Sequence, residues 1–218
     1  WWALQRWGRP QPSVPQSLDG QPSPVPETST NVALQVAQVG TGASVGRENA
    51  PRVAGALWAD RVAAWARMSP ELRRLLIASA AGAGLAAAYH VPLAGIAFAI
   101  ELCGVGIRLH KVIVVSATCV IATVISALIE PTGQQYSAPR VTCSWTTLLF
   151  AIVVGVIIGP LGSAFRRLAR WCQHWATHDA RILYRMPAGF ALAGIAAMSL
   201  PALAGNGKYA AVSAFDAS

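Results

Sequence analysis

The sequence contains few charged residues. Asp, Glu, Lys and Arg make up only 12% of its 218 residues, whereas soluble domains average about 25%. Hydrophobic residues make up 54%, and the mean hydropathy is +0.45. This composition excludes an ordinary soluble domain and indicates a membrane protein.

Acidic residues are scarcer than basic ones, with 9 Asp and Glu against 17 Lys and Arg. The basic residues are spread between the apolar segments and do not form the clustered face that nucleic-acid binding requires, so we expect no nucleic-acid partner. Loop arginines beside anionic lipid headgroups explain them better. The arginines between Arg166 and Arg185 crowd one linker, which the positive-inside rule places in the cytoplasm.

The sequence also lacks a metal-binding or redox pattern. Its four cysteines stand alone, without the short CxxC spacing of such sites, and we interpret them as packing residues. His174 and His178 are four residues apart, but two imidazoles on a Trp-rich stretch favour an interfacial role over a metal site. An enzyme that uses Glu48 and His90 would have no nucleophile or metal behind it. We therefore predict no metal, no cofactor and no enzymatic activity.

The sequence contains five long segments without charged residues. Each is near or above the length of about 18 residues that marks a candidate membrane span. They predict an all-α membrane protein, a multispanning bundle of about five or six membrane segments. The segments are Thr28–Gly46, Leu75–Ile100, Val112–Ile129, Val141–Phe165 and Met186–Gly207.

Proline and glycine divide the chain into shorter helices. Residues 1–30 are rich in proline and are predicted to be loop and short interfacial helix, whereas residues 31–218 form the membrane region. The pattern Ser69-Pro70-Glu71 is typical of a helix start. That helix is expected to break at Tyr89–Pro92, and a break at membrane depth is tolerated only where it is buried in protein or lines a polar cavity. Further helices are expected over about 49–68, 144–176 and 185–204.

Glu48 is the residue that most needs an explanation. A charged side chain at membrane depth costs roughly 2.5–3.5 kcal/mol on insertion scales, so such residues usually mark an ion or proton path. The helix that begins after Glu48 offers unpaired N–H groups and the positive end of its dipole, which together attract an anion. A tethered carboxylate can occupy that position and act as a gate. Alternatively, Glu48 only caps the helix or pairs with Arg47 or Arg52.

Two motifs in this order resemble the CLC family of chloride channels and chloride/proton exchangers. Residues 42–51, which contain Gly46-Arg47-Glu48-Asn49-Ala50-Pro51, are similar to the family's Gly-Arg/Lys-Glu-Gly-Pro motif. Residues 75–101 resemble the paired half-helices that follow it. The resemblance implies one part of an inverted-repeat fold, a homodimer with one anion pore in each subunit, and a bacterial-type plasma membrane location. It also implies Glu48 as the gate, the N–H groups of Asn49 and Ala50 as anion donors, and a turn shaped by Gly46, Arg47 and Pro51.

The sequence departs from the family pattern in three places. The upstream Gly-Ser-Gly-Ile-Pro motif is represented only by residues 8–12, which contain no serine, and Ser13 is a conjectural substitute. The gate motif has one more residue before its proline. The position after Glu101, where exchangers of the family carry a proton-relay glutamate, is Leu102.

These departures favour uncoupled anion conduction by a fragment of a larger domain. A proton-coupled antiporter that uses Glu101 is an alternative, although a pair between Glu101 and Arg108 is the simpler interpretation. A degenerate scaffold that transports nothing is the second alternative, because the family's later motifs would lie beyond Ser218.

Overall fold

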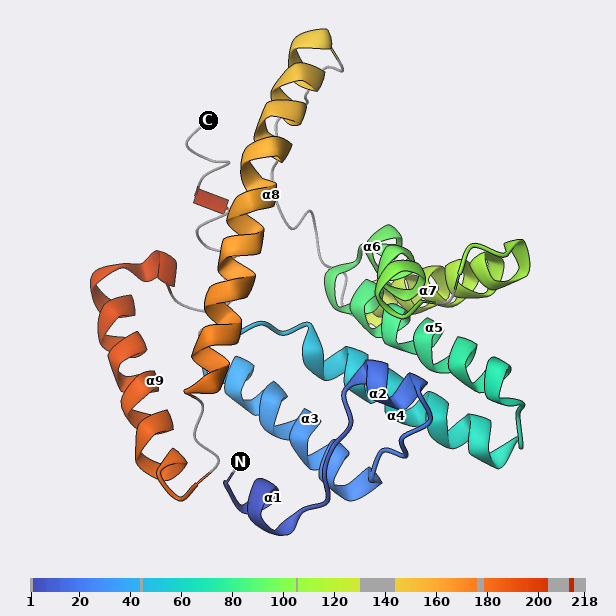
Figure 1. The fold of residues 1–218 in the computed structure, drawn as a ribbon, viewed down its shortest axis with the longest axis horizontal. Helices are drawn as coiled ribbons and strands as arrows, with labels where there is room; N and C mark the ends of the chain where they lie inside the picture. Colours follow the sequence, from blue (N-terminus) through green and yellow to red (C-terminus); the bar gives the residue numbers. More distant parts are fainter. Residues whose placement is uncertain are drawn as a thin grey trace.

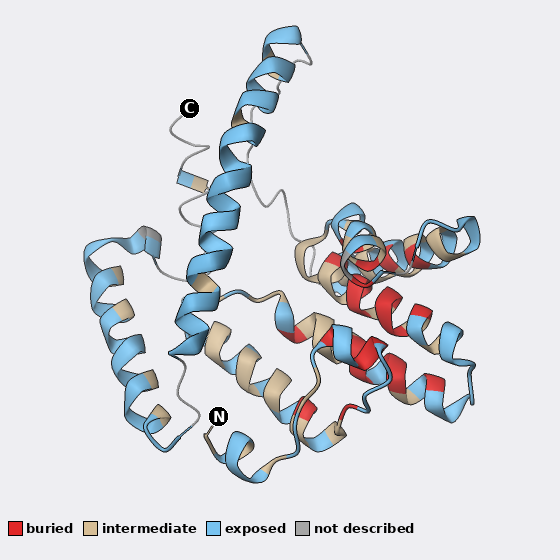
Figure 2. Cartoon of the chain, in the orientation of Figure 1, coloured by how far each residue is buried: buried red, intermediate tan, exposed pale blue. Residues whose placement is uncertain are grey.

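The computed structural model describes residues 2–43, 45–104, 106–129, 144–175, 179–203 and 212–213. All regular secondary structure in these residues is helical. Helices α2 to α7 form a packed group, and α8 and α9 stand apart from it (Figure 1). Buried residues concentrate in α4 and α5 (Figure 2). The expected all-α membrane fold is confirmed.

The N-terminal segment is more helical than its proline content suggested. Two short helices, α1 (Trp2–Trp7) and α2 (Val14–Leu18), precede α3 (Val25–Gly40). Pro26 lies in the first turn of α3, where the missing N–H removes no intrahelical hydrogen bond. Because α3 crosses position 30, it joins the proline-rich segment to the membrane region, and the boundary between the two stays a prediction.

Helices α4 (Asn49–Trp65) and α5 (Pro70–Tyr89) form a hairpin. Ser69 caps α5 by accepting a hydrogen bond from the N–H of Leu72 at 3.4 Å, and Pro70 occupies the first turn, as the sequence predicted. The short connection makes the two helices antiparallel, so the start of α4 lies beside the end of α5 (Figure 1).

Glycine allows the two helices to approach closely. A Cβ at Gly55 would collide with the main-chain oxygen of Ala80, and a Cβ at Gly84 would collide with that of Pro51. In lipid there is no hydrophobic force that drives helices together, so they associate through close packing, which small residues allow. Gly55 and Gly84 therefore serve the close packing of α4 against α5.

A partly buried ion pair lies at the closed end of the same hairpin. Arg73 of α5 places two nitrogen atoms on Oδ1 of Asp60 of α4, at 2.5 and 2.7 Å. Asp60 is only 4% exposed. Sequence analysis missed this pair, although an acid within a helix rich in alanine was a signal for it.

The break after α5 has the expected position. Tyr89 is the last residue of α5, and His90 has a left-handed conformation with φ of 54°. Helix α6 (Pro92–Ala97) then continues directly into a π-helical turn, η1 (Phe98–Leu102). Gly95 of α6 packs against Gly82 of α5 so closely that a Cβ on either would meet the other's carbonyl group.

Helix α7 (Leu109–Ile129) covers the other side of α5. Lys111 at its start forms an ion pair with Glu71 at the start of α5, with 2.9 Å between Nζ and Oε1. Hydrogen bonding to Lys111 lowers the pKa of the Glu71 carboxyl group. Glu71 is exposed, so this surface pair contributes little to stability.

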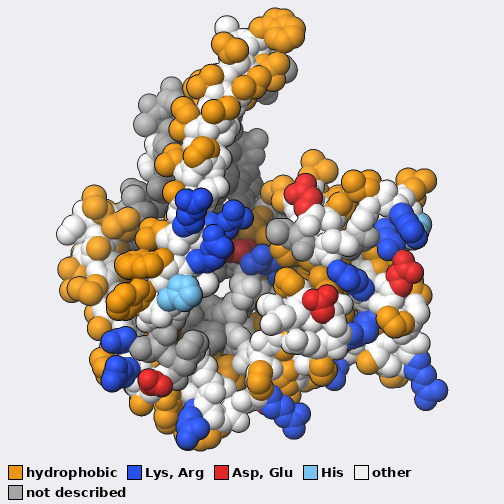
Figure 3. Space-filling view, viewed as in Figure 1, with side chains coloured by type: hydrophobic (Ala, Val, Ile, Leu, Met, Phe, Trp, Pro, Cys, Tyr) orange, Lys and Arg blue, Asp and Glu red, His pale blue; other side chains and the backbone are white. Residues whose placement is uncertain are grey.

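Three of the described helices are long and apolar enough to cross a membrane, namely α7, α8 (Trp145–His174) and α9 (Ile182–Ser199). The other expected segments are represented by the shorter or broken helices α3 and α5 to η1. Neither α8 nor α9 has a buried residue, and hydrophobic side chains cover α8 (Figure 3). Such surfaces require lipid or further protein around them. Cys143 and His178 lie outside the described residues.

We predict that Gly84→Ala destabilises the α4–α5 hairpin, because the added methyl group has to displace the main chain at Pro51. Overpacking of this kind costs typically about 1–3 kcal/mol. The thermal unfolding midpoint of the full-length protein in detergent should fall. The control is Gly155→Ala in α8, where a Cβ meets nothing within 4 Å. Equal midpoints for the two variants would contradict the predicted close approach.

Candidate functional site

The turn before α4 and the break after α5 meet at one place. Helix α3 ends at Gly40 and Glu48 is the residue before the first turn of α4. Tyr89, the last residue of α5, donates a hydrogen bond from its hydroxyl group to Oε2 of Glu48 at 3.1 Å. The structure thus joins the two motifs that were separate in the sequence.

The carboxylate of Glu48 folds back over the preceding residues. It lies so close to Gly46 that a Cβ at that position would collide with both carboxylate oxygens. Glu48 makes no side-chain cap to α4. This glycine therefore leaves the space that the side chain of Glu48 occupies, and a helix cap is not the role of this carboxylate in the structure.

Two arginines flank Glu48 without forming an ion pair with its carboxylate within the described residues. The guanidinium carbon of Arg47 lies 4.9 Å from the centre of the Tyr89 ring. Arg52 donates from Nε to the main-chain oxygen of Glu48 at 2.9 Å, and its guanidinium carbon lies 5.2 Å from the ring of Phe98. The site thus holds two positive groups and one negative group, a balance that favours an anion.

A row of side-chain amides fixes the start of α4 from the other side. Asn49 donates to Oε1 of Gln35 at 3.0 Å, and Gln35 donates to Oδ1 of Asn31 at 2.6 Å. Asn31 in turn donates to Oε1 of Gln11. We call Gln11, Asn31, Gln35 and Asn49 the amide row. It connects the N-terminal loop through α3 to the residue after Glu48, and sequence analysis did not find it.

A cavity of about 460 Å³ opens beside the start of α4. Arg52 is the charged side chain among its described lining residues, and Thr28, which also lines it, has a buried hydroxyl group without a partner in the part of the chain described. Ser13 lines the cavity as well, but its hydroxyl group donates to Oε1 of Gln16 at 3.0 Å. In this conformation the Ser13 proton is therefore not available to an anion.

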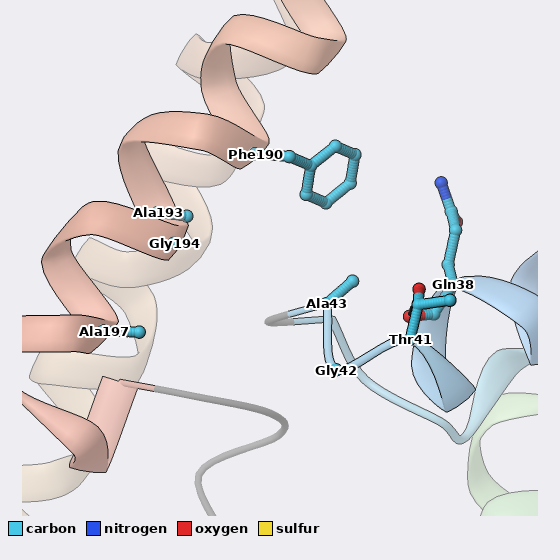
Figure 4. Close-up of a pocket in the computed structure, with 8 residues that line it drawn as sticks. All are labelled: Gln38, Thr41, Gly42, Ala43, Phe190, Ala193, Gly194 and Ala197. Carbon is cyan, nitrogen blue, oxygen red and sulfur yellow. Dashed lines mark hydrogen bonds between the residues drawn. The ribbon is translucent and has the colours of Figure 1, made fainter.

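A second cavity, of about 400 Å³, lies between the end of α3 and α9. Figure 4 shows the ring of Phe190 directed from α9 toward Gln38 and Thr41. Its described lining carries no charged side chain, so we place the candidate site at Glu48. The lining residues are Gln38, Thr41, Gly42, Ala43, Phe190, Ala193, Gly194 and Ala197.

Comparison with known proteins is consistent with this arrangement. The profile of the family described as "Voltage gated chloride channel" matches residues 1–218. The chain belongs to this family. It is 28% identical over 190 residues to the voltage-gated ClC-type chloride channel ClcB of Yersinia pseudotuberculosis serotype O:1b (strain IP 31758), over 79% of this chain and 44% of that protein.

A second relative is the ClcB channel of Escherichia coli O81 (strain ED1a). It is 29% identical over 181 residues, which are 81% of this chain and 43% of the relative. The chain thus spans less than half the length of the curated relatives that it matches. Family membership identifies it as a multi-pass membrane protein related to chloride channels.

The remaining predicted site residues lie near Glu48, with one exception. Asn49 is exposed, Ala50 is buried, and the carbonyl group of Pro51 packs against Gly84. Glu101 belongs to the separate turn η1, where it is exposed. Among the described residues it forms no ion pair with Arg108, so the simpler interpretation of Glu101 is not what the structure shows.

The contacts that the sequence did not reveal are the hydrogen bond from Tyr89 to Glu48, the hydrogen bond from Arg52 to the main chain of Glu48, and the amide row. The sequence indicated Tyr89 only as the first residue of a predicted helix break. Its partner lies 41 residues earlier, and their contact depends on how α4 and α5 are rotated against each other.

We expect Gln35→Met to loosen the turn at Glu48, because it removes the hydrogen bonds that Gln35 makes with Asn31 and Asn49. One of these hydrogen bonds is partly buried and the other is exposed, so the loss should be about 0.5–1.5 kcal/mol, the usual net contribution of a hydrogen bond. Hydrogen exchange at the start of α4 should accelerate. Gln38→Met, one turn further along α3, is the matched control. Equal exchange rates in both variants would show that the amide row does not support the turn.

Proposed function

We propose that the chain is part of an anion channel or transporter that carries chloride, with Glu48 as its gate. The observation that carries this proposal is a single carboxylate at the start of a helix, flanked by Arg47 and Arg52 and packed against a helix break. A carboxylate without a salt bridge can leave its position when it is protonated or when an anion competes with it.

The anion would be held by groups at the same turn. The N–H groups of Asn49 and Ala50 belong to the first turn of α4, where the helix dipole favours negative charge. Arg52 and Thr28 line the adjoining cavity and offer further donors. Gly46, Arg47 and Pro51 shape the turn. No cofactor and no metal is part of this proposal, and the transported ligand is the inorganic anion itself.

The complete protein would act as a homodimer in the plasma membrane, with one pathway in each subunit. The broken helix α5–α6 fits this type of pathway, because interrupted helices in transporters point their ends at bound ions. The remaining part of the pathway would come from the portion of the protein that this chain does not span.

We predict that Glu48→Ala in the full-length protein raises chloride efflux from liposomes at neutral pH and weakens its dependence on acidification. The reason is that the alanine has no carboxylate to occupy the anion position. Efflux is measured with a chloride electrode between pH 4.5 and 7.5. Asp19→Asn, which changes an exposed carboxylate directly after α2, is the control and should behave like the wild type. Equal pH profiles for Glu48→Ala and the wild type would refute the gate, and no efflux from either would favour a scaffold.

A proton-coupled antiporter is the second candidate, and the exposed position of Glu101 favours it. Glu101 has no ion-pair partner among the described residues and lies in a π-helical turn, a feature frequent at functional sites. Proton flux that accompanies chloride flux would support this mechanism. Glu101→Gln should then abolish proton flux and leave chloride movement intact.

A further inference from the structure

The hydroxyl group of Tyr89 is the one side-chain donor that the described structure gives to the carboxylate of Glu48. We propose that Tyr89 is a positioning residue that holds the gate carboxylate closed from the end of α5. This inference rests on the proposed role of Glu48. It adds a specific partner, on a different helix, that determines where the carboxylate rests.

Tyr89 is carried by a different element from Glu48, at the end of α5. Tyr89 is still within α5, and the left-handed His90 ends the helix directly after it, with its N–H bonded to the carbonyl group of Ala86. Further on, the imidazole of His90 lies 3.0 Å from Oγ of Ser126 in α7. These contacts anchor the end of α5, and with it the backbone of Tyr89, to α7.

Arg47 restrains the same ring. Its guanidinium group lies over the face of Tyr89, an arrangement that is attractive because the ring face carries negative charge. The Nε atom of Arg47 is buried and has no hydrogen-bond partner among the described residues. Arg47 thus orients the ring of Tyr89, and the carboxylate of Glu48 is bonded to the Tyr89 hydroxyl group and not to Arg47.

The other groups around Glu48 do not replace this contact. On α4, Arg52 binds the main-chain oxygen of Glu48 and not its carboxylate. Helix α3 carries one charged residue, Glu27, in its first turn and far along the helix from Glu48, and α2 carries none. The charged residues of α5 are in its first two turns, at the opposite end from Tyr89.

The hydrogen bond favours the closed position of the deprotonated carboxylate. A bond to a charged acceptor is roughly twice as strong as one between neutral groups, so protonation of Glu48 weakens it. Opening by acidification therefore includes the loss of the tyrosine contact. Without the hydroxyl group, less acidification is needed to release the gate.

The test is Tyr89→Phe in the full-length protein, which keeps the ring beneath Arg47 and removes only the hydroxyl group. We expect the pH of half-maximal chloride efflux to move upward by roughly 0.5–1 units, from the usual strength of such a bond. Tyr184→Phe in α9, where the tyrosine is exposed, should leave the profile unchanged. In a Glu48→Ala background, Tyr89→Phe should have no effect on the profile.

The outcomes separate this inference from the proposed gate. If Glu48→Ala alters the efflux and Tyr89→Phe does not, the gate stands and the role of Tyr89 is refuted. If neither the wild type nor the variants conduct chloride, the proposed function fails. The contact between Tyr89 and Glu48 is then tested by thermal unfolding instead. The loss in unfolding midpoint of the double variant Glu48→Ala, Tyr89→Phe should then be smaller than the sum of the single losses, whereas an additive loss would overturn the contact.

Discussion

The close antiparallel approach of α4 and α5 is the constraint on which the rest of the structure depends. Pro51 faces Gly84, and one turn further along Gly55 faces Ala80. This register places the residue before α4 beside the residue that ends α5. The distance between Glu48 and Tyr89 is thus determined by two glycines that touch neither of them, which explains why a stretch of small residues is needed beside a polar site.

Two carboxylates of the hairpin, those of Asp60 and Glu48, differ in how firmly their surroundings hold them. Asp60 is buried and bonded to two nitrogen atoms of Arg73, and separating such a pair leaves an uncompensated charge, at a cost of about 3–5 kcal/mol. Glu48 is held by one neutral hydroxyl group, while the nearby arginines are engaged with aromatic rings and the main chain. The first carboxylate is fixed in the fold, and the second is held by fewer interactions, as the proposed gate requires.

Local signals in the sequence were sufficient for the helix ends and not for the contacts between helices. Ser69 and Pro70 predicted the start of α5, and the sequence Tyr89–Pro92 predicted its end, because caps and proline act on their own neighbours. The start of α3 at Val25 was missed, since proline in a first turn is compatible with helix and loop alike. The pairs Asp60–Arg73 and Glu48–Tyr89 depend on helix rotation, which spacing alone does not determine.

The turn departs from its family motif at Asn49, and the side chain of Asn49 is also part of the amide row. Where the motif has glycine after the glutamate, this chain has Asn49, and its side chain is bonded to Gln35 of α3. Through Asn31 and Gln11 the same row reaches the loop that lines the cavity beside Arg52. A glycine turn is held by its backbone geometry, whereas this turn is held by side chains from α3 and α5. Its position therefore depends on the packing of both helices, so a change in either one is transmitted to Glu48.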